Sequence, residues 1–230
     1  FDRKMISKIF SIADTLEKKK DASLKGKIMA SLFYEPSTRT RFSFESAMLR
    51  LGGSVITTEN AKEFSSVSKG ETLEDSIRVI NNYVDVIVLR HDEEGSAERA
   101  SLVSEVPVIN AGDGTGQHPS QALLDLYTIK KELKKIDGVS IAFVGDLKHG
   151  RTIRSLAYLL GKYTDIQIYF VSPKALRVGE DIKNYLRKYG VDFTETEDLS
   201  AVAHKVNVLY QTRIQKERFK NDTEYKKYKG

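Results

Sequence analysis

The stretch Glu35-Pro36-Ser37-Thr38-Arg39-Thr40-Arg41 decides how this chain folds. It separates an apolar run at 28–33, typical of a buried strand, from a helical pattern of apolar residues at 44–51. A strand that ends at a proline and turns through small hydroxyl residues into a helix presents backbone N–H groups at the positive end of that helix. The guanidinium groups of Arg39 and Arg41 accompany them. The stretch therefore predicts a seat for a phosphate.

Outside this stretch, short β-rich runs alternate with segments of helical periodicity along the whole chain. Such alternation favours parallel sheets covered by helices and joined by right-handed crossovers. The expected strands are 28–33, 55–58, 85–90, 106–110, 140–144, 166–171, 191–194 and 206–211. The expected helices are 3–19, 44–51, 73–80, 97–103, 123–133, 154–160 and 182–189.

A seam in this pattern predicts two domains. A helix that begins at Pro119, where a missing N–H does no harm, runs to about Lys135 and links two α/β halves. We therefore expect domains at 1–134 and 135–230, each a mostly parallel sheet flanked by helices. In such sheets ligands bind beyond the carboxyl ends of the strands, so we expect the active site in the cleft between the two halves.

Composition excludes several classes of protein. The 230 residues are 40% hydrophobic and 30% charged, which is typical of a folded globular chain. No apolar run has the length of a membrane span, and no signal peptide is recognisable, so we expect a cytoplasmic protein without a membrane partner. The net charge of +5 comes without a nucleic-acid recognition motif. The absence of cysteine and the scatter of four histidines argue against a metal site.

Polar clusters follow five of the expected strands at their carboxyl ends. Because these ends lie at one edge of a parallel sheet, side chains distant in sequence can meet there. Taken singly, an arginine at a strand end is more often ion-paired or at the surface than a ligand contact. Neither a dinucleotide fingerprint nor a Walker A sequence is present. The clusters lie at 37–40, 90–91, 110–121, 145–152 and 211–216.

Four of these clusters together resemble one enzyme family. Residues 33–45 are similar to the carbamoyl-phosphate signature of the aspartate and ornithine carbamoyltransferases, and 110–126 are similar to their second shared motif. Residues 144–152 and 212–219 resemble the aspartate branch of the family, as does the lysine of 69–72. The resemblance covers nearly the whole chain.

The resemblance assigns roles to individual residues. It implies that Arg39, Thr40, Lys69, Arg90 and His118 are catalytic. The carbamoyl-phosphate ligands that it implies are Ser37, Thr38, Arg39, Thr40, Ser65, Arg90, His118 and Gln121. The aspartate ligands that it implies are Lys69, Arg151, Arg213 and Gln215.

The implied reaction is attack of the aspartate amine on the carbamoyl carbon, which gives N-carbamoyl-L-aspartate and phosphate for pyrimidine synthesis. The resemblance implies no cofactor and no metal. It also implies a homotrimer, because Ser65 and Lys69 lie on a loop that reaches a neighbouring subunit's site in this family. The presence of regulatory subunits, nucleotide effectors and cooperativity stays open.

Two alternatives remain at this point. One is a carbamoyltransferase for ornithine or another amino acid, which would carry a neutral or acidic contact in place of Arg213-Ile214-Gln215. The other is an anion-binding module without catalysis, although the presence of Arg151 and Arg213 counts against it. The family pattern has threonine at Ser120, tyrosine at His149 and histidine at Arg154. Because the family continues past Gly230 with a further substrate-binding segment, we expect the chain to be truncated at its C-terminus.

Overall fold

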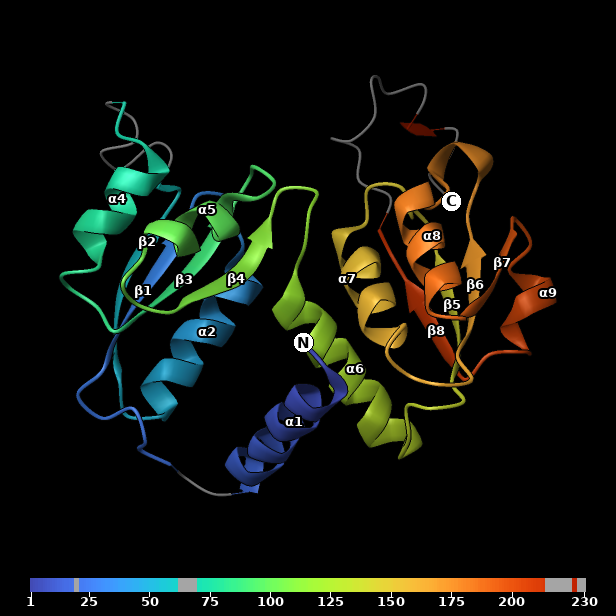
Figure 1. The fold of residues 1–230 in the computed structure, drawn as a ribbon, viewed down its shortest axis with the longest axis horizontal. Helices are drawn as coiled ribbons and strands as arrows, with labels where there is room; N and C mark the ends of the chain where they lie inside the picture. The colour runs from blue at the N-terminus through green and yellow to red at the C-terminus, as the bar shows by residue number, and fades with distance from the viewer. Residues whose placement is uncertain (19–20, 62–69, 214–224, 227–230) are drawn as a thin grey trace. The chain divides into compact units, whose positions relative to one another are not determined.

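The computed structural model describes residues 1–18, 21–61, 70–213 and 225–226. These residues form two compact units. The first unit comprises residues 7–120, and the second unit comprises residues 1–6 with the residues from 121 onward. Each unit contains one four-stranded parallel sheet covered by helices (Figure 1). The predicted fold class of two α/β domains is therefore confirmed.

The sheet of the first unit has the strand order β2-β1-β3-β4. Its two central strands are almost wholly buried, because both faces of a parallel sheet are covered by helices. Strand β2 lies at one edge, and its residues are half-buried or exposed. The strands are β1 (Ile28–Phe33), β2 (Ser54–Glu59), β3 (Val86–His91) and β4 (Val108–Asp113).

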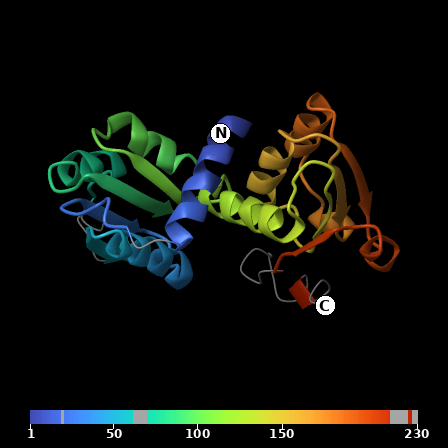
Figure 2. The same ribbon diagram turned by 90° about the horizontal axis from the view of Figure 1, so that it is seen from below.

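Side chains alternate between the two faces of β1, as expected for a strand. Ala30 and Leu32 pack into the cluster that contains Leu73 and Ile77, whereas Met29 and Phe33 pack with Met48 on the other face. Figures 1 and 2 accordingly show α2 on one side of the sheet and α4 with α5 on the other. These helices are α2 (Thr38–Arg50), α4 (Leu73–Ile80) and α5 (Ser96–Val103).

The sheet of the second unit has the order β7-β6-β5-β8. The last strand in sequence pairs with the first one, since Ile141 lies opposite Val208 and Phe143 opposite Tyr210. Strands β5 and β6 contribute Phe143 and Phe170, whose stacked rings are both fully buried. The strands are β5 (Ser140–Val144), β6 (Gln167–Val171), β7 (Asp192–Thr196) and β8 (Val208–Gln211).

Helices cover this second sheet in the same way. Val202 of α9 packs with Ala142, Val144 and Val171, while α7 and α8 lie side by side (Figure 1). The helices are α6 (Pro119–Leu133), α7 (Arg151–Leu160), α8 (Glu180–Lys188), α9 (Ser200–Ala203) and the short 3₁₀ helix η2 (Lys174–Leu176). Helix α6 begins at the end of the first unit and continues in the second.

Helix α1 (Arg3–Lys18) begins in the second unit. There Arg3 forms an ion pair with Asp137 and lies over the ring of Tyr163. Ile6 and Phe10 are buried. The boundary between residues 134 and 135 stays a prediction, as does the position of the active site. No helix among the described residues combines the length and apolarity that crossing a bilayer requires.

Candidate functional site

Each sheet has a switch point, where the chain leaves adjacent strands in opposite directions and where α/β proteins bind their ligands. In the first unit the switch lies between β1 and β3, and in the second unit between β5 and β8. The predicted ligands lie at the carboxyl ends of these four strands: Arg90 within the last residues of β3, and Ser37–Thr40, Arg151 and Arg213 in the segments after β1, β5 and β8. The two sets of candidate residues therefore lie at the two switch points.

The predicted phosphate seat is the N-terminus of α2. Ser37 is the N-cap residue, and its side chain makes no capping hydrogen bond. The Arg41 amide donates to the Ser37 carbonyl, which is the first bond of the helix. The amides of Thr38, Arg39 and Thr40 come before that bond, at the positive end of the helix dipole. A helix start of this kind favours a bound anion.

Arg41, the second guanidinium of the opening stretch, has a different role from Arg39. Its Nη1 lies 2.8 Å from Glu59 on β2, and its Nε lies 3.8 Å from Glu45 on its own helix. Glu45 in turn accepts hydrogen bonds from Ser31 and Thr57. Arg41 therefore ties α2 to the edge of the sheet, and Arg39, which is exposed, is the guanidinium that fits the predicted seat.

Arg90 is the penultimate residue of β3 and is buried opposite Phe33 of β1. Its Nη2 lies 3.0 Å from the Glu35 carboxylate, and its Nη1 donates to the Ala111 carbonyl at 3.4 Å. These contacts hold the guanidinium across the ends of three neighbouring strands. Sequence reasoning quoted Glu35 only as part of a motif, because an ion pair between residues so far apart leaves no periodic signal.

His118 lies in a buried position directly before α6. The turn that leads to it is fixed by Asp113, whose carboxylate accepts hydrogen bonds from the Gln117 and Gly95 amides. Ser120 Oγ lies 3.3 Å from His118 Nδ1. Gly114 donates to the His91 carbonyl, which attaches this turn to the end of β3. His118 and Arg90 are thus held by adjoining segments of one sheet edge.

The second unit carries the predicted aspartate ligands. Buried Arg151 begins α7 after the loop from β5, and exposed Arg213 follows β8. The two loops touch, since the Thr212 amide and hydroxyl both donate to the Val144 carbonyl. Gly145 has φ +111°, and a Cβ there would lie 2.7 Å from Thr212 Oγ1. Only glycine allows this approach without strain.

A third element of the candidate site is Gln121 in the first turn of α6. Its Nε2 donates to Asp125 Oδ1 at 2.8 Å, and Tyr210 of β8 donates to Asp125 Oδ2 at 2.9 Å. Burial raises the pKa of Asp125, and the two hydrogen bonds partly oppose this shift. Burial and the Asp125 charge also raise the pKa of Tyr210. Sequence reasoning missed this pair, whose members are 85 positions apart.

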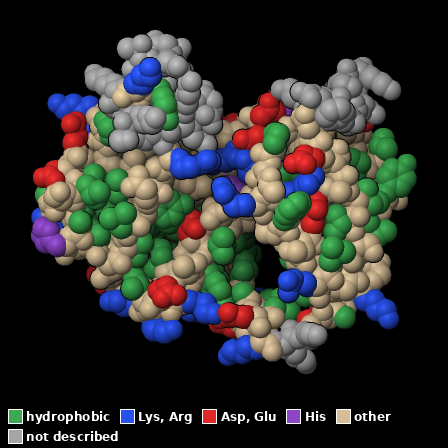
Figure 3. All heavy atoms as spheres, turned by 180° about the vertical axis from the view of Figure 1, so that it is seen from behind, with side chains coloured by type: hydrophobic (Ala, Val, Ile, Leu, Met, Phe, Trp, Pro, Cys, Tyr) green, Lys and Arg blue, Asp and Glu red, His purple; other side chains and the backbone are tan. Residues whose placement is uncertain are grey.

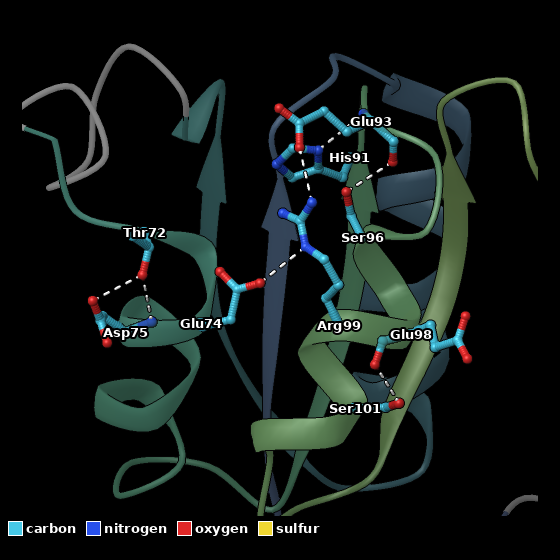
Figure 4. Close-up of polar contacts among 9 residues, drawn as sticks. All are labelled: Thr72, Glu74, Asp75, His91, Glu93, Ser96, Glu98, Arg99 and Ser101. Carbon is cyan, nitrogen blue, oxygen red and sulfur yellow. Dashed lines mark hydrogen bonds and ion pairs between the residues drawn. The ribbon is translucent and has the colours of Figure 1, made fainter.

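Acidic residues around α4 and α5 form ion pairs within the first unit and do not belong to the predicted phosphate seat. Figure 4 shows Glu74 of α4 and Glu93 of the loop after β3 pointing toward Arg99 on α5, at 2.9 and 3.3 Å. Thr72 caps α4, its hydroxyl accepting from the Asp75 amide and donating to the Asp75 carboxylate. Glu74 therefore ties α4 to α5.

Three predicted site residues, Ser65, Lys69 and Gln215, lie outside the described residues. Among the residues that the structure does describe, no three carboxylate or imidazole side chains are grouped as a metal ion would require. On the face drawn in Figure 3, hydrophobic side chains reach the surface between basic and acidic ones. Large exposed hydrophobic residues of the first unit include Phe42, Leu49 and Ile56.

Comparison with family models gives two matches that together span most of the chain. A model described as the carbamoyl-P binding domain of aspartate/ornithine carbamoyltransferase matches residues 1–131. A second, described as the Asp/Orn binding domain of the same enzymes, matches residues 137–230.

Individual relatives agree with these models. An aspartate carbamoyltransferase of Arabidopsis thaliana, named chloroplastic, is 60% identical over 95% of this chain. The solved catalytic subunit of the Methanocaldococcus jannaschii aspartate transcarbamoylase is 53% identical, with a TM-score of 0.91 over 99% of this chain and 76% of its own. The solved Trypanosoma cruzi enzyme with N-(phosphonacetyl)-L-aspartic acid is 42% identical, with a TM-score of 0.90 over 98% of this chain and 73% of its own. The chain spans 57% of the Arabidopsis protein.

Proposed function

Because this chain belongs to the aspartate/ornithine carbamoyltransferase family, we propose that it transfers the carbamoyl group of carbamoyl phosphate to the amine of L-aspartate. The products are N-carbamoyl-L-aspartate and phosphate, and the reaction serves de novo pyrimidine synthesis. The observation that carries the proposal is the presence of cationic residues at the switch points of both sheets.

The first unit binds carbamoyl phosphate in this proposal. Its phosphate accepts hydrogen bonds from the first amides of α2, from the hydroxyls of Ser37, Thr38 and Thr40, and from Arg39. Thr40, Arg90 and His118 donate to the carbamoyl oxygen. The ion pair of Arg90 with Glu35 supports this role, because it holds the guanidinium in one orientation before substrate binds. Ser65 completes the proposed set.

The second unit binds the amino acid through Arg151, Arg213 and Gln215, with Lys69 from the sequence that precedes α4. Aspartate carries two carboxylates, and two guanidinium groups match them with forked hydrogen bonds. Ornithine carries a second amine instead, which these arginines would repel. The contact between Thr212 and Val144 supports the pairing, since it brings the backbones that carry Arg151 and Arg213 together.

The reaction follows from the charges that these residues offer. The aspartate amine attacks the carbamoyl carbon, its electron pair forms the new C–N bond, and the carbonyl oxygen becomes an oxyanion. Arg90, His118 and Thr40 stabilise that oxyanion, and its collapse expels phosphate as the amine loses a proton. Holding carbamoyl phosphate and aspartate, two anions that repel each other, in a reactive orientation supplies much of the rate acceleration. No covalent intermediate with the protein and no cofactor is part of this proposal.

One assay tests the proposal against its alternatives. The full-length protein is incubated with carbamoyl phosphate and either L-aspartate or L-ornithine, and the ureido product is measured. A ureido product from aspartate alone is the expected result, whereas a product from ornithine alone would identify the other branch of the family. Binding of phosphate without any product would indicate a non-catalytic anion-binding module.

We further propose a homotrimer in which Ser65 and Lys69 serve a neighbouring subunit's site. Phe42 and Leu49, 55% and 59% exposed, lie two turns apart on α2. Ile56, 53% exposed, lies on the edge strand β2 and faces the side of the sheet opposite α2, because its neighbour Val55 packs on the α2 side. Exposed apolar side chains at a sheet edge are typical of an interface, which supports a contact between copies here.

Light scattering and subunit mixing test the trimer. Arg39→Ala and Lys69→Ala subunits, each inactive alone, should regain activity when mixed, because some sites then receive both intact residues. Failure to recover activity would contradict shared sites. The archaeal relatives are named catalytic subunits, so co-purification of a second polypeptide in the same experiment would identify a regulatory partner.

We propose a cytoplasmic location. The named plant relatives are chloroplastic, which is a property of those proteins. Fractionation of the source cells with an antibody against this chain tests the location, and enrichment in an organelle would contradict it.

A further inference from the structure

Gln121, Asp125 and Tyr210 form a hydrogen-bonded chain inside the second unit. Gln121 and Asp125 lie one turn apart on α6, so their side chains share one face of the helix. The two oxygens of Asp125 are divided between two donors, Gln121 Nε2 at 2.8 Å and the Tyr210 hydroxyl at 2.9 Å. All three residues are half-buried.

The surroundings of Tyr210 keep this chain in place. Its ring packs edge-on against buried Phe143, with centroids 5.4 Å apart. The side chain of Thr152, the residue after Arg151, also lies near the Tyr210 oxygen and partly opposes the rise of the Tyr210 pKa. Asp125 thus has a fixed position relative to β8 and α7, and this position does not depend on Gln121.

A fixed carboxylate determines which way a neighbouring amide faces. An ionised carboxylate only accepts hydrogen bonds, whereas the two branches of a glutamine amide differ, one being a donor and the other an acceptor. Gln121 therefore has to place Nε2 against Asp125. Its Oε1 is then the branch turned away from Asp125. With a neutral partner that both donates and accepts, the amide could adopt either orientation at similar cost.

We propose that Asp125 is a positioning residue that fixes the Gln121 amide so that Oε1 accepts a hydrogen bond from the amino group of the carbamoyl donor. This inference rests on the proposed function. Asp125 is then a determinant of donor specificity. Gln121 Oε1 accepts a hydrogen bond from an NH₂ group, whereas a methyl group in the same place would offer it no hydrogen. The residue itself contacts no substrate.

Acetyl phosphate is the matching probe, because it replaces the amino group of carbamoyl phosphate with a methyl group and retains the same phosphate and carbonyl. In the full-length protein, kcat/KM is measured for each donor with L-aspartate, and the ratio of the two values reports recognition of the amino group. We expect Asp125→Asn to lower this ratio about ten-fold, since a site built to hydrogen-bond a substrate group discriminates by that bond. A purely structural loss would reduce both values together.

Tyr210→Phe is the matched control. It removes one bond that holds the carboxylate but leaves Asp125 a partner that only accepts, so the Gln121 amide should keep its orientation. The thermal midpoint should therefore fall while the donor ratio stays within about two-fold of wild type. An unchanged ratio in Asp125→Asn would overturn the proposal. An equal fall of the ratio in Tyr210→Phe would overturn it too, because the effect would then come from disruption of the whole chain of bonds.

A second pair of variants covers the case in which Asp125→Asn does not fold. Asp125→Glu keeps a partner that only accepts, and Asp125→Ser introduces one that donates and accepts. The ratio should be kept in the first and lowered in the second, and the opposite order would overturn the proposal. If the wild-type protein forms no ureido product from carbamoyl phosphate and aspartate, the proposed function fails instead, and the two failures are thereby distinguished.

Discussion

In both sheets, a short polar side chain joins two neighbouring strands at their N-terminal ends, but the side chain is a carboxylate in one sheet and an amide in the other. We call each of these joints a closure. In the first unit, Asp85 before β3 exchanges hydrogen bonds with Ile28 of β1, its amide donating to the carbonyl and its carboxylate accepting from the amide at 2.8 Å. In the second unit, Asn207 before β8 does the same with Ser140 of β5, accepting from its amide at 3.1 Å. Asp85 also pairs with Lys27, and Asn207 accepts from the Ser140 hydroxyl.

Both closures lie between the two strands that flank the switch point. At one end of these strand pairs, a short polar side chain joins the strands. At the other end, the strands separate into the loops that carry the candidate site. The position of each closure thus follows from the sheet topology. Whether the joining side chain is a carboxylate or an amide depends on its immediate neighbours. The carboxyl ends of the two sheets also share a position and differ in chemistry. The first sheet is proposed to act on the reacting carbonyl, and the second on the carboxylates of the second substrate.

The largest effect is expected at the carboxyl end of the first sheet. Arg90→Ala and His118→Ala should each lower kcat about 10²–10³-fold, as removal of one oxyanion donor typically does. Both variants should remain folded by circular dichroism. Near-normal turnover in both would contradict the proposed division of roles between the two sheets.

The corresponding changes in the second sheet should act mainly on binding. Arg151→Ala and Arg213→Ala should raise the KM for aspartate about 10–100-fold, because each loses hydrogen bonds to a charged group. The KM for carbamoyl phosphate is the internal control. A fall in kcat alone, without a change in the KM for aspartate, would show that the two sheet ends do not differ in this respect.

A smaller effect is expected from the close approach at the second switch point. Gly145→Ala should destabilise the protein by about 2–3 kcal/mol, since its backbone conformation disfavours a side chain and its Cβ would press on Thr212. Gly190→Ala is the matched control, with φ +68° and no atom within 4 Å of the added Cβ. Chemical denaturation measures both. Equal losses in the two variants would show that the contact with Thr212 contributes nothing.

The smallest expected effect is a change in stability at the two closures, which are formed by Asp85 and Asn207. The hydrogen bond from Lys27, followed by that from the Ile28 amide, holds the pKa of Asp85 below its usual range. A lowered pKa contributes stability above the unfolded value, about 3.9, and that stability is lost as the pH falls through the folded value. Asp85→Asn should therefore lower the thermal midpoint at pH 7, and this difference from wild type should disappear in acid.

Calorimetry between pH 7 and pH 3 checks the acid behaviour, and Asn207→Asp is the reciprocal variant. The new carboxylate can accept from the same Ser140 groups, so this protein should fold and acquire an additional dependence on acid. A gap between Asp85→Asn and wild type that stays constant over this pH range would show that the charge of Asp85 has no part in the closure.

Most elements were predictable because the chain alternates apolar runs of two distinct periods. Strands β1 and β5 and helix α4 have the predicted bounds. Helix α2 begins six residues before the predicted start, because its first turn, Thr38–Arg41, is polar and contributes nothing to apolar periodicity. Strand β4 continues to Asp113 through Ala111 and Gly112, which are poor strand formers, alongside a register shift opposite Leu89 and His91. The short helices α9 and η2 are too brief to give a periodic signal.

The candidate site was predictable where it depends on strand ends and not where it depends on distant pairs. The positions of Arg90, His118, Arg151 and Arg213 follow from parallel topology, which places the carboxyl ends of strands together. The partners of these positions, such as Glu35 for Arg90, depend on which side chains the finished fold brings together. No pattern of spacing along the chain encodes that.

The pairing of β5 with β8 sets an order for folding during synthesis. The strands of the first sheet are complete once residue 113 has been made, whereas β5 lacks one neighbour until Val208–Gln211 has left the ribosome. Helix α1 is affected as well, because Arg3 and its partner Asp137 are 134 positions apart. Domains generally fold as units while the chain is being made. A nascent chain thus has a finished first sheet before Arg3 finds its partner.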